Sequence, residues 1–251
     1  GWVIDPKKKA SKSFRGLLHD AVCNSKKTFV VSSFYNKELL DIYDLPINKL
    51  AVIPNIVNTK FYENKSTIAM SYPVRLIVVA YLVKRKNHIT LFDALKRLKQ
   101  KGVAIVLDVV GNGSYENELQ NYVEINELKE NIRFNGLLTR SEIVSLVKES
   151  HIVVSASTFE TFGVNIIEGL SMGRPCVVLD SGGPRDIVRK EDGVLFEENT
   201  SKSLEEALVK VITNYDSYNQ PEIANSCIDR FGEEVIYNNL MAEYKLCGYG
   251  Q

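Results

Sequence analysis

The sequence lacks the features that assign many proteins to a class at first sight. No apolar run among its 251 residues reaches the roughly 18 residues needed to cross a bilayer, and no secretory signal is expected. Its 31 basic residues are matched by 31 acidic residues, so no electrostatic field favours nucleic acid or a strongly acidic partner. Any ligand must therefore be recognised by a few local groups.

Cysteine is scarce and never closely paired. The four cysteines are Cys23, Cys176, Cys227 and Cys247, and no two of them form a CxxC motif. This spacing is typical of reduced thiols in a cytoplasmic protein. The hydrophobic content of 45% is sufficient for a substantial core, so we expect one large globular domain or two smaller ones.

From about residue 75 onward, short β-branched runs alternate with longer amphipathic segments. The runs predicted as strands are 75–82, 103–111, 131–136, 151–157, 175–180 and 193–197. Such alternation is typical of βαβ units on a parallel sheet. The first run, RLIVVAYL, is continuously apolar, as expected for a strand that is buried on both faces. We therefore predict an α/β protein with a Rossmann-like, doubly wound parallel sheet.

The beginning of the chain has a shorter α/β pattern. Strands are predicted at 27–33 and 49–55 with a helix between them, whereas 59–73 has polar and turn residues without a period. The predicted parts are a partial α/β unit at 1–60, a linker at 61–73, a complete unit at 74–230 and a final helix at 231–251.

Gly111, Asn112 and Gly113 follow a predicted strand and precede a helix. This order is that of the dinucleotide fingerprint GxGxxG, but Glu116 occupies the position of the third glycine. A simple chain reversal and a close approach of the backbone to a ligand explain the two glycines equally well. The failed fingerprint argues against a dinucleotide-dependent oxidoreductase.

The segment STFETFGVNIIEGLSMGRP carries two glutamates, Glu160 and Glu168. A helix that begins near Thr161 to Gly163 would leave its first N–H groups unpaired at the end of a strand, where they favour an anion. Gly163 would also remove side-chain bulk where a ligand must approach. A carboxylate suits a vicinal diol, so two carboxylates beside an anion site fit a nucleotide sugar. A helix cap together with a solvated acid is the alternative interpretation.

A basic stretch, VKRKNH, ends the first strand of the same predicted unit. Lys86 is the best candidate for a point charge on a diphosphate, because it falls at the sheet edge where the anion site is predicted. The alternative is a solvated surface run.

In their order along the chain, these motifs resemble those of retaining glycosyltransferases of the GT-B fold in glycosyltransferase family 4. The family hallmark, two glutamates separated by seven residues, is matched by Glu160 and Glu168. AYLVKRKNH resembles the family's phosphate motif, GNG its glycine turn, GGPRD its second glycine loop and VIPNIVN its domain junction. The resemblance covers most of residues 27–240. It implies that the complete unit is the C-terminal half of a GT-B fold and that the first unit is a remnant of the acceptor-side domain.

The resemblance also implies a role for each matching position. Glu160 and Lys86 would be the catalytic residues, with Glu160 on the donor sugar's hydroxyls and Lys86 on the leaving diphosphate. Glu168 would hold the ribose. The other predicted binding residues are Thr161, Phe162, Gly163 and Val164 for the distal phosphate and sugar, Gly111, Asn112, Gly113 and Arg85 around the phosphates, and Leu137 and Leu138 near the base.

The implied partners are a UDP- or GDP-sugar donor and a glycan or lipid-linked acceptor in cell-surface glycan biosynthesis. The resemblance implies no metal and no further cofactor. The acceptor would be bound by the largely missing first domain, so this chain is expected to transfer sugar weakly or not at all by itself. A cytoplasmic location is expected. The basic stretch Lys7 to Arg15 is a candidate for contact with the inner face of a membrane, although a solvated loop is the interpretation that we favour for it.

One position departs from the family pattern. Tyr81, preceded by Ala80, stands where the family has an arginine, and this removes half of the usual phosphate clamp. Lys84 and Arg85 are the candidates to replace it. The departure keeps two alternatives open, a non-catalytic nucleotide-sugar binding module and a GT-B-fold nucleotide-sugar epimerase or phosphorylase.

Overall fold

The structure is a computed structural model that describes residues 12–249. Its strands are β1 (Thr28–Val30), β2 (Leu50–Val52), β3 (Val74–Val79), β4 (Ile105–Val110), β5 (Ile132–Gly136), β6 (Ile152–Ser155), β7 (Cys176–Leu179) and β8 (Gly193–Phe196). Its α-helices are α1 (Lys12–Asn24), α2 (Ser33–Tyr43), α3 (Thr59–Tyr62), α4 (His88–Gln100), α5 (Glu116–Ile125), α6 (Arg140–Glu149), α7 (Val164–Ser171), α8 (Ser201–Thr213), α9 (Gln220–Phe231) and α10 (Glu233–Leu246). The 3-10 helices are η1 (Ile47–Lys49), η2 (Lys84–Lys86), η3 (Gly183–Asp186) and η4 (Tyr215–Ser217).

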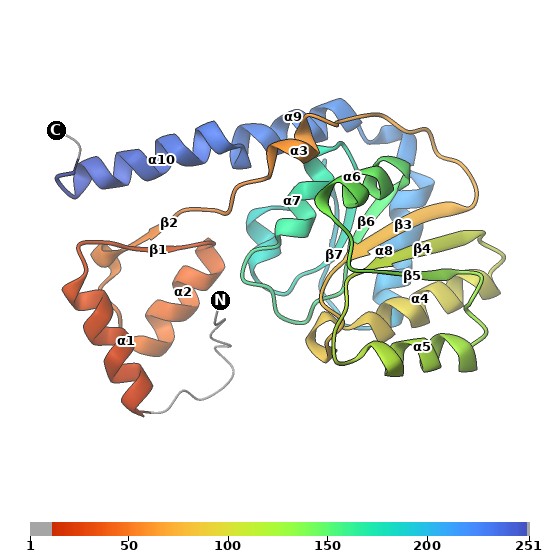
Figure 1. Cartoon of the computed structure of the whole chain (residues 1–251), viewed down its shortest axis with the longest axis horizontal. Helices are drawn as coiled ribbons and strands as arrows, with labels where there is room; N and C mark the ends of the chain where they lie inside the picture. Colours follow the sequence, from red (N-terminus) through yellow and green to blue (C-terminus); the bar gives the residue numbers. More distant parts are fainter. Residues whose placement is uncertain (1–11, 250–251) are drawn as a thin grey trace.

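The larger unit is built on a six-stranded parallel sheet with the order β5-β4-β3-β6-β7-β8 (Figure 1). Strands β4 and β5 lie on one side of β3, and strands β6, β7 and β8 lie on the other side. This is the doubly wound order, and the direction reverses between β3 and β6. The predicted fold class is confirmed, and each of the six predicted runs overlaps one of these strands.

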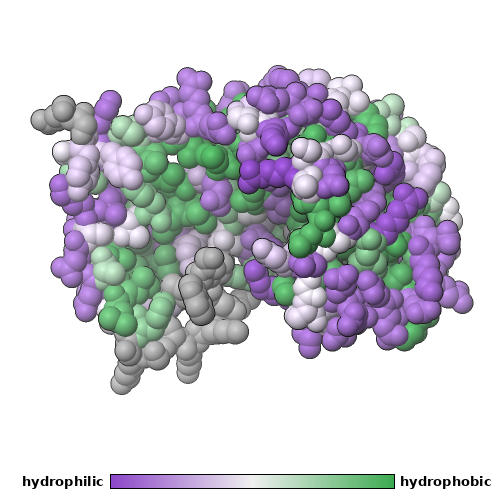
Figure 2. Space-filling model, viewed as in Figure 1, coloured by the Kyte–Doolittle hydropathy of each residue, from purple (hydrophilic) through white to green (hydrophobic). Residues whose placement is uncertain are grey.

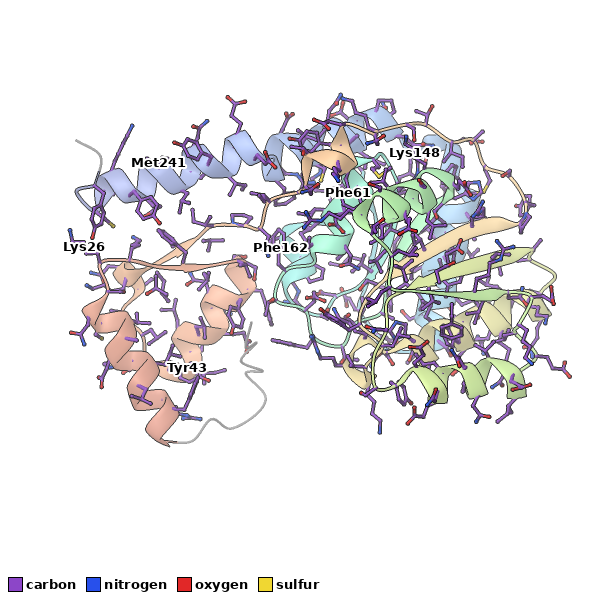
Figure 3. The ribbon with its side chains drawn as sticks, in the orientation of Figure 1. Lys26, Tyr43, Phe61, Lys148, Phe162 and Met241 are labelled. Carbon is purple, nitrogen blue, oxygen red and sulfur yellow. The ribbon has the colours of Figure 1, made fainter. Side chains whose placement is uncertain are left out.

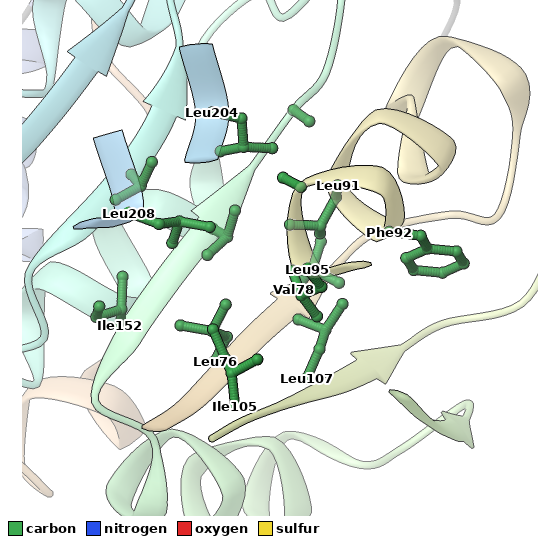
Figure 4. Close-up of a cluster of buried hydrophobic side chains, with 14 of the residues drawn as sticks. Leu76, Val78, Leu91, Phe92, Leu95, Ile105, Leu107, Ile152, Leu204 and Leu208 are labelled. Atoms are coloured by element: carbon green, nitrogen blue, oxygen red, sulfur yellow. The ribbon is translucent and has the colours of Figure 1, made fainter. Parts of the chain in front are cut away.

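Helices cover both faces of this sheet, so its strands are apolar on both sides. Leu76 and Val78 of β3 pack with α4 and α8 on one face, as the close-up of this core shows (Figure 4). Ile77, which points the other way, packs with α6, α7 and α9 on the opposite face. The alternation within one strand explains why residues 76–79, LIVV, have no polar position facing either layer.

The smaller unit consists of the parallel pair β1 and β2 with helices α1 and α2. Its core is a separate cluster of buried residues: Val22, Val30, Leu39, Tyr43, Leu45 and Leu50. Helix α10 runs from the larger unit back over this sheet (Figure 1). There the Tyr244 ring meets the Phe29 ring edge to face at 5.9 Å, and Lys27 pairs with Glu243 at 3.5 Å. Figure 2 shows hydrophobic side chains gathered between α10 and β1 and β2.

Helix α3 lies in the stretch 59–73, where the sequence showed no period, and it overlaps the start of the predicted linker at 61–73. Its Phe61 is fully buried, in the same cluster as residues of α6 and α7. Asn58 caps the helix by accepting the N–H of Lys60. Four residues are too few to display a helical period, so the sequence pattern could not reveal this element.

Two sequence expectations concern membranes. The basic stretch Lys7 to Arg15 lies mostly outside the described residues. Among residues 12–249, no helix has both the length and the apolar character that a membrane span requires.

Candidate functional site

A cavity of about 370 Å³ opens where the sheet order reverses. Its walls come from the segments that follow the carboxyl ends of β3, β4, β5 and β6, the position at which doubly wound sheets bind ligands. The lining residues are Asn55, Val79, Ala80, Tyr81, Lys86, Val110, Gly111, Leu137, Leu138, Ile143, Glu160, Thr161, Phe162, Gly163, Val164 and Asn165. Nine of the predicted site residues are among them: Lys86, Gly111, Leu137, Leu138, Glu160, Thr161, Phe162, Gly163 and Val164.

Lys86 and Glu160 form an ion pair in the cavity wall. The Lys86 ammonium lies 2.5 Å from a carboxylate oxygen of Glu160, and the two side chains are 11% and 15% exposed. Their segments are joined by the Arg85 carbonyl, which accepts the N–H of Thr158 at 2.9 Å and its hydroxyl at 3.2 Å. Residues assigned separately to diphosphate and sugar therefore neutralise each other in this structure.

A run of backbone N–H groups lies beside this pair. Helix α7 begins at Val164 with Gly163 as its N-cap. This is the C-terminal end of the stretch Thr161 to Gly163, where the sequence predicted that the helix begins. Among the described residues, no hydrogen bond is donated by the N–H groups from Thr161 to Asn165. Unpaired amides at a helix N-terminus attract anions, because both the N–H dipoles and the helix dipole present positive charge there.

The structure gives Gly163 a different role from the predicted one. Its φ of +127° is a conformation that other residues rarely adopt. A Cβ at this position would lie 2.6 Å from Cδ1 of Ile166, inside the protein. Glycine is therefore needed for the backbone turn and its packing, and the interpretation that it makes room for a ligand is not supported.

The turn Gly111 to Gly113 is packed against the segment that follows β3. A Cβ on Gly111 would lie 2.0 Å from the Ala80 carbonyl oxygen, and one on Gly113 would lie 2.2 Å from that of Leu82. The carbonyl of Asn112 accepts the N–H of Leu82 at 2.8 Å. Close packing of one chain segment against another, which neither sequence explanation included, requires glycine at both positions. Asn112 and Gly113 do not line the cavity.

The remaining lining is mainly apolar. Leu137 follows β5 and is 69% exposed, and Leu138 and Ile143 line the same cavity. Tyr81 is 68% exposed at the wall. The cavity thus combines one charged pair and free amides with an apolar surface of the kind on which a flat ring can lie.

Neither candidate replacement for the missing arginine reaches the cavity. The Arg85 side chain is exposed and absent from the lining. The Lys84 ammonium lies 5.7 Å from the centre of the Tyr115 ring. Among residues 12–249, Lys86 is consequently the one cationic residue in the lining.

Glu168 lies one helical turn beyond Val164 and is not part of the lining. Burial raises the pKa of this carboxyl to about 7, and the charge of Arg140 acts in the opposite direction. The structure therefore does not place the two glutamates in one cavity wall. The i,i+4 spacing predicts that Glu168 lies on the same helix face as Val164. It does not predict how far along the helix the cavity extends.

Sequence reasoning missed two groups of residues. The first is the lining residues Asn55, Val79, Val110, Ile143 and Asn165. Of these, Asn55 follows β2, so the rule that ligands collect at strand ends could have indicated it. The second group is a set of contacts from α2 to the cavity loops, in which the Ser32 hydroxyl donates to the Thr161 carbonyl at 2.7 Å. No local sequence signal indicates a partner 129 residues away.

Comparison with known proteins identifies relatives of this chain. The family described as glycosyl transferases group 1 matches residues 60–225. An uncharacterized glycosyltransferase of Methanocaldococcus jannaschii is 28% identical over 195 residues, which are 77% of this chain and 52% of that protein. A UDP-Gal:alpha-D-GlcNAc-diphosphoundecaprenol alpha-1,3-galactosyltransferase of Escherichia coli is 32% identical over 176 residues, 65% of this chain and 45% of that protein. The chain thus spans about half the length of these two relatives.

Solved structures show the same fold. The Anabaena protein HepE, solved in complex with UDP and glucose, superposes with a TM-score of 0.80 at 18% identity. The match covers 94% of this chain and 67% of that one. It therefore includes both units described above.

Proposed function

This chain belongs to the family of glycosyl transferases group 1, and we propose that its cavity binds the sugar and diphosphate of a UDP- or GDP-activated donor. The observation that carries this proposal is the meeting of the Lys86–Glu160 pair with the unpaired amides of Thr161 to Asn165 in one cavity. These groups supply positive charge for a diphosphate and a carboxylate for sugar hydroxyls.

Donor binding exchanges the partners of the ion pair. The diphosphate takes the Lys86 ammonium, and the Glu160 carboxylate is then available to accept hydrogen bonds from hydroxyl groups of the sugar. In the transfer step the bond between the anomeric carbon and the diphosphate breaks, and its electron pair leaves with the diphosphate. The hydroxyl oxygen of the acceptor forms the new bond to the anomeric carbon, and its proton passes to the departing diphosphate. The amides at the start of α7 and Lys86 stabilise that developing charge.

We further propose that the full-length protein is a retaining, metal-independent enzyme of glycosyltransferase family 4. The named relative from Escherichia coli uses UDP-Gal, and the Anabaena neighbour is solved with UDP, which supports a nucleotide-sugar donor. The acceptor in this proposal is a glycan or a lipid-linked sugar. Because the chain is about half as long as its curated relatives, we expect it to bind donor but to transfer little sugar by itself.

Titration calorimetry of the chain with UDP, GDP, UDP-glucose, GDP-mannose and NAD tests this proposal. A UDP or GDP species is expected to bind, and Lys86→Ala should weaken that binding roughly tenfold or more, since it removes the cation from the lining. Lys84→Ala is the matched control, because Lys84 lies in the same turn of η2 but outside the cavity. Preference for NAD, or equal binding by Lys86→Ala and the wild type, would refute the proposal.

A further inference from the structure

Ser32 links the smaller unit to the wall of the cavity. It is fully buried, and its hydroxyl donates to the Thr161 carbonyl oxygen at 2.7 Å. The Ser32 hydroxyl oxygen also accepts the N–H of Tyr35 at 3.1 Å and so caps α2. One side chain thus ends a helix of the smaller unit and holds a backbone group of the cavity loop.

The next two residues of α2 hold a second loop of the larger unit. The Asp186 carboxylate accepts the N–H and the hydroxyl of Ser33, each at 2.5 Å. The Phe34 ring lies so close to Gly182 that a Cβ there would be 2.4 Å from it. The start of α2 is therefore seated on the loop that contains η3.

These two loops of the larger unit are themselves joined. The N–H of Gly183 donates to the Glu160 carbonyl at 2.8 Å, and the N–H of Glu160 donates to the Ser181 carbonyl at 3.3 Å. A Cβ on Gly183 would lie 2.3 Å from the Thr161 carbonyl oxygen. Residues 160–162 and 181–183 consequently form one packed body on which α2 rests.

The contact from Ser32 sets the direction of a peptide in the cavity wall. The peptide between Thr161 and Phe162 is planar and trans, so its carbonyl and its N–H point in opposite directions. Because the carbonyl points to Ser32, the Phe162 N–H points away from Ser32, and it has no acceptor among the described residues. Phe162 itself lies on the side of the larger unit that faces the smaller one (Figure 3).

We infer that Ser32 is a positioning residue of the donor site, and that the site is complete only while the smaller unit is seated on the loop of Asp186. The hydroxyl of Ser32 fixes the Thr161–Phe162 peptide and so directs an amide toward the donor's anionic group. This inference rests on the proposed function, since it assigns a role within the same donor site. Donor binding then depends on the smaller unit, although none of its described residues contributes a charge to the cavity lining.

A purely structural role for Ser32 makes a different prediction. If its hydroxyl only caps α2, its loss should lower stability without a specific effect on the ligand. Thr200 provides the comparison, because it caps α8 by accepting the N–H of Ser203 at 3.1 Å and does not line the cavity.

The test measures the affinity of four forms of the chain for UDP and GDP: wild type, Ser32→Ala, Ser32→Thr and Thr200→Ala. Ser32→Ala is expected to bind roughly five- to tenfold more weakly, Ser32→Thr should recover most of the affinity, and Thr200→Ala should bind as the wild type does. Amide hydrogen exchange at Gly183 should accelerate in Ser32→Ala but not in Thr200→Ala. If Ser32→Ala proves unstable, Asp186→Asn should weaken binding in the same direction, because an amide replaces one of the two accepting oxygens.

The outcomes separate this inference from the proposed function. If the wild type binds neither UDP nor GDP, the proposed function fails and the inference falls with it. If the wild type binds and Ser32→Ala binds equally well, the inference alone is overturned. An equal loss of affinity in Thr200→Ala would also overturn it, because the effect would then follow from the loss of any helix cap.

Discussion

Two buried cations of the larger unit are used in opposite ways. Arg174 is fully buried, and each of its donor nitrogens is bonded. Its acceptors are the carbonyls of Val147, Ser66 and Lys148, the Ser66 hydroxyl and the Gln220 side chain, at 2.7 to 3.2 Å. The Lys86 side chain is 11% exposed, and among the described residues Glu160 is the one hydrogen-bond partner of its ammonium. The Lys148 label in Figure 3 marks the end of α6 where the Arg174 network lies.

The difference separates a structural network from an exchangeable pair. A guanidinium has five donors, and all five face acceptors from three segments, so no ligand can bind Arg174 without breaking the fold. An ammonium has three donors, and the Lys86 ammonium lies in the wall of a cavity. Burial alone therefore does not reveal a functional charge. What distinguishes the site is unused hydrogen-bonding capacity next to open space.

The largest effect on stability is expected at Arg174, whose five N–H donors are all bonded. Arg174→Met should lower the free energy of unfolding by on the order of 3–5 kcal/mol, because it leaves several buried acceptors without donors. Urea denaturation followed by circular dichroism measures this loss. A destabilisation below about 1 kcal/mol would break the comparison, since Arg174 would then not be a structural hub.

The half-buried acid Glu168 extends the comparison to an acidic side chain. Burial raises the pKa of Glu168 to about 7, so the folded state keeps a proton that the unfolded state loses near pH 4.5. Stability should therefore fall as the pH rises from about 4.5 to 7, and Glu168→Gln should remove that fall. At pH 8 the variant should be more stable than the wild type by on the order of 1–3 kcal/mol, with no difference near pH 4. Equal stability of the two proteins at pH 8 would contradict a half-buried, unpaired carboxylate.

The smallest effect is expected at the Lys86–Glu160 pair, and it concerns affinity for an anion. Glu160→Gln removes the negative charge that competes for Lys86, so inorganic pyrophosphate should bind several-fold more tightly. Stability should change little, because the pair lies at a cavity wall rather than inside a saturated network. Calorimetric titration with pyrophosphate measures the gain. A weaker affinity in the variant would show that Glu160 orients Lys86 for the anion instead of competing for it.

The sequence allowed the larger unit and the position of its site to be predicted, because both depend on local patterns. Each of the six predicted runs overlaps a strand, and the order of strands and helices favours the doubly wound sheet. The rule that ligands collect at strand ends then predicted that Lys86 and Glu160 lie at the same edge of the sheet. It could not predict their direct contact, which depends on side-chain directions.

Other parts of the site depend on contacts between distant segments. The spacing of Glu160 and Glu168 did not show that the helix carries Glu168 out of the cavity wall. Likewise, Arg85 belongs to the predicted basic stretch, but η2 turns it toward solvent while Lys86 points inward. The bond from Ser32 to Thr161 joins two units, and nothing in either segment alone indicates it.

The most direct test of the account is a crystal structure of the chain with a UDP- or GDP-sugar that binds in solution. The account predicts that the Lys86 ammonium lies within hydrogen-bond distance of the diphosphate and that the Glu160 carboxylate has left Lys86 for a hydroxyl of the sugar. A nucleotide sugar bound outside this cavity, or bound within it while the Lys86–Glu160 pair remains closed, would contradict the central claim.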